Sequence, residues 1–386
     1  MVASIALPRV MRVGAGAVEH LGDVVADLGL QRPLVVTDAF LVSTGAADRM
    51  LNILTKAGLI PRLFPDTVPD PTTDSLEAGL QALAEHRADV VIGFGGGSPM
   101  DTAKALGLLG QQGGQMRDYK APRMNTGPAL PVVAVPTTAG SGSEATQFTV
   151  ISDSTTEEKM LCPGVAFLPV AAIIDYELTV SMPPRLTADT GVDALTHAIE
   201  AYVSCKANPF ADSMALSAVQ TISRALPRAY ADGNDADARA QMMLASTQAG
   251  IAFSNSSVAL VHGMSRPIGA HFHVAHGLSN AMLLPAVTAF SLDAAESRYA
   301  DCARAYGAAN AADDDPAAAR KLLAALTDLC HDVEVPTPRS YGIDKARWEE
   351  LTPLMAQQAL TSGSPGNNPR IPTQDQIQDL YAQIYG

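Results

Sequence analysis

Cysteine and positive charge are both scarce in this chain of 386 residues. The four cysteines lie far apart and form no CxxC pair, which excludes a disulfide-dense scaffold and a cysteine zinc cluster and indicates a reducing cytoplasm. Lys and Arg total 26 against 40 Asp and Glu, so the formal charge is −14. That balance argues against nucleic acid or an anionic membrane surface as the main partner.

Long apolar runs are absent as well. No stretch approaches the ~20 uncharged apolar residues of a membrane span, so none is expected. The opening segment, MVASIALPRVMRVG, does not have the apolar run of a signal peptide, and we expect a cytoplasmic protein. With 47% apolar and 17% charged residues, the composition is that of a globular protein, and the length predicts two or three domains.

The first half alternates short apolar runs with helical patterns such as residues 73–86. The runs are rich in β-branched residues, are bounded by Gly, Pro or Asp, and cover residues 34–37, 90–94, 132–135 and 171–174. They predict buried parallel strands, and the alternation predicts an α/β domain whose sheet is covered by helices on both faces.

The pattern changes at residues 178–186, where two consecutive prolines interrupt both strand and helix. Beyond this point the Ala- and Leu-rich segments have helical spacing and no convincing strand. We therefore expect a dinucleotide-binding α/β domain at residues 1–180 and an all-helical domain at residues 181–386.

A glycine turn follows the second predicted strand, in the order Gly95, Gly96, Gly97, Ser98. Without Cβ atoms at the turn, a bulky anion can approach backbone N–H groups at the start of a helix, which favours a pyrophosphate site. A tight strand-to-helix turn is the simpler alternative. Ser98 takes the place of the last glycine of a GxGxxG fingerprint, and we expect it to cap the following helix.

Two other predicted strands also end in polar groups. Asp38 follows residues 34–37, where a carboxylate would hold a ribose diol and repel a 2′-phosphate, although a helix N-cap is equally compatible. Thr137 and Thr138 follow residues 132–135 and suit phosphate or nicotinamide contacts, or simply a flexible loop.

The second half contains a metal-ligand pattern. Asp193 and His197 are four residues apart, which places them on one face of a helix, and His262 and His276 follow at a spacing of fourteen. One carboxylate and three imidazoles suit Fe²⁺ or Zn²⁺ better than Mg²⁺ or Ca²⁺. Packed structural histidines are the alternative, which is weakened because five of the eight histidines fall at 197 and 262–276.

With these motifs the chain resembles the iron-containing (group III) metal-dependent alcohol dehydrogenase family, and within it the lactaldehyde reductase and propanediol dehydrogenase group. The resemblance rests on GGGSPMDTAK (95–104), VPTTAGSGSEAT (135–146), MPPRLTADTGVDALTHAIEAY (182–202) and the histidine-bearing segment 253–277. It implies the dehydroquinate synthase-like two-domain architecture, with the active site in the cleft between the domains.

The resemblance also implies a function: reversible hydride transfer between a small primary alcohol or diol and NAD, with NADP disfavoured. The ligands of Fe²⁺ or Zn²⁺ would be Asp193, His197, His262 and His276. The cofactor contacts would be Asp38, Asp70, Gly95, Gly96, Gly97, Ser98, Asp101, Thr137, Thr138, Thr146, Lys159 and Leu178. It further implies a homodimer or larger homo-oligomer whose partners are small alcohols and aldehydes.

One position departs from the family. Four residues after His262, where relatives often carry a second histidine, this chain has Arg266. Arginine stays protonated near neutral pH, so it cannot act as a base there. It would instead bind a substrate carboxylate or a cofactor phosphate, and His271 or His273 would relay the proton.

Three other functions are compatible with the sequence. A hydroxyacid dehydrogenase or maleylacetate-reductase-like enzyme would use Arg266 for a substrate carboxylate. A sugar-cyclising synthase resembling dehydroquinate synthase would need more basic residues near its site, and a non-catalytic NAD-binding protein would not need the four ligands.

Overall fold

The computed structural model describes residues 2–156 and 158–386. The chain divides into two compact units. The sheet unit comprises residues 4–138 and 142–180, and the helical unit comprises residues 2–3, 139–141 and 181–386. The short segment 139–141 thus packs with the helices although the chain on either side of it packs with the sheet.

The sheet unit contains a six-stranded sheet in which every neighbouring pair is parallel. In spatial order its strands are β1 (Val10–Val13), β8 (Ala171–Ile174), β5 (Val132–Pro136), β4 (Val90–Gly95), β2 (Pro33–Val36) and β3 (Arg62–Phe64). The four strands predicted from sequence are confirmed. They are the central ones and are buried on both faces, which is why they consist of continuous apolar runs.

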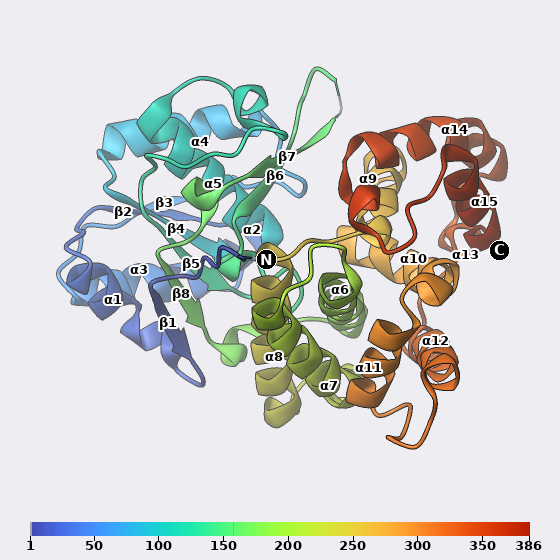
Figure 1. The fold of residues 1–386 in the computed structure, drawn as a ribbon. Helices are drawn as coiled ribbons and strands as arrows, with labels where there is room; N and C mark the ends of the chain where they lie inside the picture. The colour runs from blue at the N-terminus through green and yellow to red at the C-terminus, as the bar shows by residue number, and fades with distance from the viewer. Residues whose placement is uncertain (1, 157) are drawn as a thin grey trace. The chain divides into compact units, whose positions relative to one another are not determined.

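Helices cover both faces of this sheet (Figure 1). The helices of the unit are α1 (Leu21–Asp27), α2 (Ala39–Ser43), α3 (Ala46–Lys56), α4 (Ser75–His86) and α5 (Gly97–Gln112). Leu34 and Val36 of β2 pack with α4 and α5, whereas Val35 between them packs with α1 and α3. Alternate side chains of one strand therefore belong to two separate cores.

A two-stranded antiparallel hairpin, β6 (Phe148–Ser152) and β7 (Lys159–Pro163), lies beside α5. Lys104 of α5, 1% exposed, joins the helix to the hairpin. Its Nζ donates to Phe148 O (2.8 Å), Ser143 Oγ (2.9 Å) and both oxygens of Thr146 (3.0 and 3.2 Å). Burial lowers the pKa of Lys104 to about 8 and raises that of nearby Asp101 to about 6, while each charge favours the other's ionised form.

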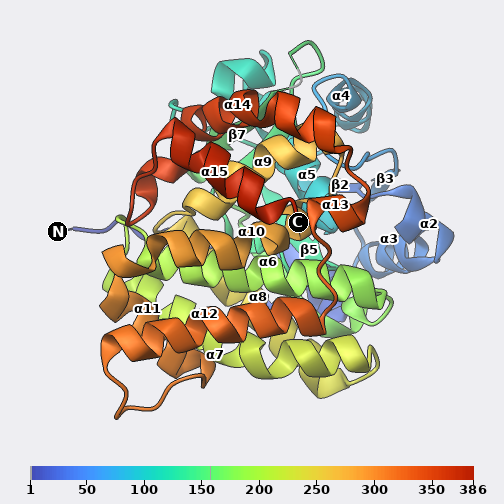
Figure 2. The ribbon, with the colours of Figure 1, turned by 90° about the vertical axis from the view of Figure 1, so that its right-hand side faces the viewer.

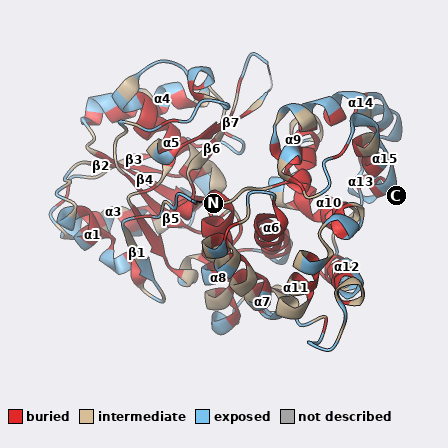
Figure 3. Cartoon of the chain, viewed as in Figure 1, coloured by how far each residue is buried: buried red, intermediate tan, exposed pale blue. Residues whose placement is uncertain are grey.

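The helical unit contains ten α-helices in the described part of the chain, and Figure 2 views them from the side. They are α6 (Pro184–Val203), α7 (Pro209–Ala231), α8 (Ala236–Ser254), α9 (Leu260–Phe272), α10 (His276–Ser291), α11 (Glu296–Tyr306), α12 (Asp315–Asp332), α13 (Pro338–Tyr341), α14 (Lys345–Thr361) and α15 (Gln374–Ile384). Helix α6 packs against α7, α8 and α10 and is buried over most of its length (Figure 3). Most polar residues on α6 therefore lie in the interior.

Helix ends follow local chemistry. Pro184 is the first residue of α6, where its missing N–H costs nothing. Side-chain oxygens cap six other helices of this unit and belong to Asn208, Asp235, Asp314, Thr337, Asp344 and Thr373. No helix in the described part of the chain combines the length and apolar character needed to cross a bilayer.

The structure corrects one detail and adds several elements. Helix α5 begins at Gly97 with Gly96 as its N-cap, so the prediction that Ser98 caps it is wrong. Pro99 is the third residue of α5 and does not disturb the helix, because N–H groups of the first turn need no partner within it. Strands β1 and β3, the hairpin and helices α9, α13 and α15 were not predicted. The strands are only three to five residues long, so their periodicity is weak.

We predict that Lys104→Met lowers the free energy of unfolding of the sheet unit by about 3 kcal/mol, because it leaves the Asp101 carboxylate without its cation. Urea unfolding followed by circular dichroism measures the change. Lys345→Met is the matched control, because Lys345 is exposed on α14. If Lys104→Met and the control unfold at the same urea concentration, the prediction is wrong.

Candidate metal centre

Helix α6 supplies two of the four predicted ligands. Asp193 and His197 are one turn apart and, at 3% and 4% exposure, both are buried. The His197 ring stacks on Phe253 of α8, with ring centroids 4.3 Å apart. That contact fixes the ring plane and leaves Nε2 turned toward the Asp193 carboxylate.

The other two ligands begin separate helices. His262 is the third residue of α9, and His276 is the first residue of α10. The start of α10 lies very close to α6, because a Cβ on Gly277 would be 2.6 Å from the Asp189 carbonyl oxygen and 3.3 Å from the Cβ of Asp193. Glycine at this position is what allows the imidazole of His276 to reach Asp193.

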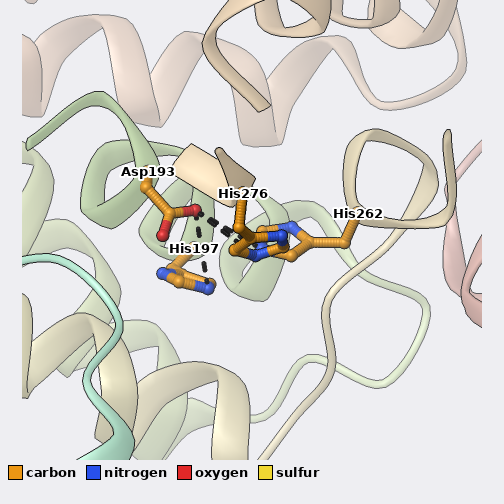
Figure 4. Close-up of side chains that lie close together, drawn as sticks. All are labelled: Asp193, His197, His262 and His276. Carbon is orange, nitrogen blue, oxygen red and sulfur yellow. Dashed lines mark ion pairs between the residues drawn. The ribbon is translucent and has the colours of Figure 1, made fainter. Parts of the chain in front are cut away.

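The four side chains converge on one point (Figure 4). One ligand atom from each lies within 4.8 Å of all the others. The Asp193 Oδ1 atom is 3.6 Å from Nε2 of His262 and 3.9 Å from Nε2 of both His197 and His276. Bonds of about 2.1 Å to one tetrahedral ion would place ligand atoms about 3.4 Å apart, so the donor set fits a single divalent cation.

The electrostatics favour an ionised carboxylate at Asp193 and a neutral ring at His197. Burial opposes ionisation of Asp193, but the three histidines outweigh it and hold its pKa below the usual range. Burial lowers the pKa of His197 to about 4, although Asp193 opposes that shift, so the ring is neutral at pH 7 with a free lone pair. Burial would also lower the pKa of His262, but Glu200 and Asp193 raise it.

Glu200 is a site residue that the sequence reasoning missed. Its Oε2 is 2.6 Å from His262 Nδ1, and its Oε1 accepts the Val261 N–H at 2.6 Å. A carboxylate on Nδ1 holds the proton there and leaves Nε2 free for a metal. The signal was present, because Asp193, His197 and Glu200 are spaced four and three apart on one helix face.

Asn280 was also missed, and it lies one turn after His276 on α10. Its Nδ2 donates to Asp193 Oδ1 at 2.6 Å and lies 3.1 Å and 3.2 Å from Nε2 of His262 and His276. Its Oδ1 is buried and has no partner among the described residues. Asn280 therefore holds the carboxylate in place at the edge of the ligand cluster.

Three residues predicted to relay a proton or bind an anion lie outside the ligand cluster in the described part of the chain. His271 Nε2 is 2.8 Å from Gln358 Oε1 on α14, and His273 is exposed at the end of α9. Arg266 Nη1 donates to Ser364 Oγ at 2.9 Å. The proton relay through His271 stays a prediction.

The predicted phosphate and ribose contacts lie at one edge of the sheet. Asp38, Gly95–Ser98 and the pair Thr137 and Thr138 follow β2, β4 and β5, which are neighbours and end on the same side. Gly95 has φ of +150°, and a Cβ there would be 2.5 Å from Pro99 Cγ, so only glycine fits. Asp38 accepts the Leu41 N–H at 3.0 Å, so it caps α2 as well as lying at this edge.

The remaining predicted cofactor residues have partners inside the sheet unit. The Asp101 carboxylate accepts from Val150 N and Ser143 Oγ, and Thr146 is occupied by Lys104. Lys159 pairs with Asp70 at 3.0 Å. Leu178 packs at the margin of the core formed by the sheet with α1 and α3.

The chain is similar to characterised proteins over nearly its whole length. A family model described as iron-containing alcohol dehydrogenase matches residues 8–176, and one for the C-terminal part of the Fe-containing alcohol dehydrogenase family matches residues 187–385. The chain is 38% identical over 378 residues to the NAD-dependent methanol dehydrogenase of Bacillus methanolicus, covering 98% of this chain and 97% of that protein. It is 37% identical over 371 residues to the lactaldehyde reductase of Escherichia coli (strain K12), covering 95% and 96%. A crystal structure of 1,3-propanediol oxidoreductase has a TM-score of 0.95 at 35% identity and covers 100% of both chains.

We predict that Glu200→Gln weakens metal binding by about 10- to 100-fold, because an amide cannot accept from both His262 and Val261 with two oxygens. Competition titration with a chromophoric chelator measures the dissociation constant. Glu349→Gln, an exposed charge on α14, is the control. Equal dissociation constants for the two variants would rule out this role for Glu200.

Proposed function

The chain belongs to the iron-containing alcohol dehydrogenase family, and from that premise we propose that it transfers hydride reversibly between a small primary alcohol or diol and NAD. The convergence of Asp193, His197, His262 and His276 within 4.8 Å is the observation that carries this proposal. In the oxidation the carbinol carbon gives a hydride to NAD⁺ and the hydroxyl group gives up a proton, which leaves the aldehyde.

The four ligands would hold Fe²⁺ or Zn²⁺, since one carboxylate with three imidazoles suits both ions. When bound, such an ion supplies Lewis acidity toward an alcohol or carbonyl oxygen, which favours hydride loss in one direction and hydride addition in the other. The family description supports iron.

The protein's own residues set the charge and orientation of this centre. Asp193 would contribute one negative charge against the two positive charges of the ion, and imidazoles, which bind a metal in their neutral form, would leave the remaining charge uncompensated. Glu200 fixes the tautomer of His262, and Asn280 fixes the Asp193 carboxylate. A ligand set held in this way does not have to reorganise during the reaction.

The nucleotide would bind along the carboxyl edge of the sheet. Backbone N–H groups at the start of α5, reached across Gly95–Gly97, would bind the pyrophosphate. Asp38 would hold the ribose hydroxyls of NAD and repel the 2′-phosphate of NADP. The relative described as an NAD-dependent methanol dehydrogenase supports the same cofactor for this chain.

We predict that the metal-loaded protein oxidises 1-propanol and 1,3-propanediol with NAD and that chelation lowers the rate at least about 100-fold. Fe²⁺ or Zn²⁺ should restore it. Metal analysis together with NADH absorbance measures both effects. An unchanged rate in the metal-free protein, or phosphate release from a sugar phosphate with no net NADH, would overturn the proposal.

We predict that Asp38→Asn lowers the preference for NAD over NADP by about tenfold or more, because the amide keeps the helix cap and removes the charge that repels a 2′-phosphate. The ratio of kcat/KM for the two cofactors measures it. Asp74→Asn, at the exposed start of α4, is the control. A preference that stays at the control value would show that Asp38 only caps α2.

A further inference from the structure

Arg266 is a cation with few protein partners. It lies on α9, one turn after the predicted ligand His262, and is only partly exposed. Its one hydrogen bond within the described part of the chain runs from Nη1 to Ser364 Oγ at 2.9 Å, in the 3-10 helix Ser364–Asn367. It forms no ion pair with any described carboxylate, whereas most of the other partly buried arginines of this unit do.

This arrangement is costly for a guanidinium, which has five N–H donors in a fixed plane. Buried charges in proteins are normally paired. Glu200 is the acid whose charge acts on Arg266, but both of its oxygens already accept from His262 and Val261. Burial lowers the pKa of Arg266 to about 10, which still leaves it positive at neutral pH.

The unused N–H groups are accessible. None of them is among the fully buried polar atoms that lack a partner in the described residues, so each keeps some solvent-accessible surface. Residues four apart on a helix lie on one face with their Cβ atoms about 5–6 Å apart. An unpaired cation therefore lies within one turn of a residue that would bind the catalytic ion.

We infer that Arg266 forms an anion subsite that takes a carboxylate at the far end of an alcohol or aldehyde substrate whose other end reacts at the metal centre. The inference rests on the proposed function and narrows its substrate class to hydroxy acids with a terminal hydroxyl group and the corresponding aldehyde acids. The carboxylate is unchanged in the reaction, since hydride leaves from the carbinol carbon to NAD⁺ and the proton leaves from the hydroxyl. A guanidinium matches a carboxylate with two parallel hydrogen bonds.

The test uses three four-carbon alcohols that differ only at the far end: 1-butanol, 1,4-butanediol and 4-hydroxybutanoate. In the metal-loaded wild type we expect the highest kcat/KM for 4-hydroxybutanoate, through a lower KM. In Arg266→Gln the ratio of kcat/KM for 4-hydroxybutanoate over 1-butanol should fall by about 10- to 100-fold. Arg266→Lys keeps the charge without the planar guanidinium, so its ratio should lie between those of the wild type and Arg266→Gln.

A binding measurement separates this subsite from the proposed function. Calorimetric titration with butanoate, which cannot be oxidised as an alcohol, should show at least about tenfold weaker binding to Arg266→Gln than to the wild type. Weaker butanoate binding to Arg266→Gln would support the subsite even if the protein oxidised no alcohol. The lack of alcohol oxidation would then overturn the proposed function and leave the subsite in place. If Arg266→Gln does not fold, the substrate ratio and the butanoate affinity of Arg266→Lys test the subsite instead.

Arg347→Gln is the matched control, because it removes the same charge from an exposed position on α14. Its substrate ratio and butanoate affinity should equal those of the wild type. If Arg266→Gln also leaves both within about twofold of the control, the subsite does not exist and Arg266 only joins α9 to Ser364.

Discussion

The helical unit depends on one buried carboxylate, that of Asp193, with three imidazoles around it. The Asp193 carboxylate and the rings of His197 and His262 are buried, and taking polar groups out of water costs free energy unless each is compensated. Asn280 donates to the carboxylate, and Glu200 accepts from His262. A divalent cation at the centre would provide the remaining compensation, and it would bind to a ligand set whose geometry the packing of α6, α9 and α10 already determines.

Two buried cations show how the protein separates stability from ligand binding. Lys104 has four acceptors around its Nζ and a carboxylate nearby, so its bonding capacity is used inside the sheet unit. Arg266 has a single hydroxyl acceptor, and its remaining donors reach accessible space. The first cation ties α5 to the hairpin, whereas the second has unused donors beside a ligand-bearing face. The complete set of partners of Lys104 fits a structural role, and the incomplete set of Arg266 is what the proposed anion subsite explains.

The most reliable predictions came from local patterns in the sequence. Asp193 and His197 could be paired because both lie on one helix and a helix repeats every 3.6 residues. The central strands could be identified because burial on both faces requires continuous apolar runs. The short strand β3 and the start of α5 could not be placed, because a few residues take their conformation from the neighbours they pair with. Asn280 was overlooked because an amide on a helix gives no sign of the side chain it contacts. Glu200 was overlooked although its spacing places it on the helix face of Asp193 and His197.

The sequence by itself determined the two-part alternation of secondary structure, the predicted metal-ligand set at 193, 197, 262 and 276, and the family to which the chain belongs. The tertiary structure alone decided that residues more than sixty positions apart share one point, that Glu200 orients His262, and that Arg266 has no carboxylate partner among the described residues. The physical reason is that periodicity records only which face of an element is buried. Distances between faces of different elements depend on packing, and on close approaches such as that of Gly277 to α6.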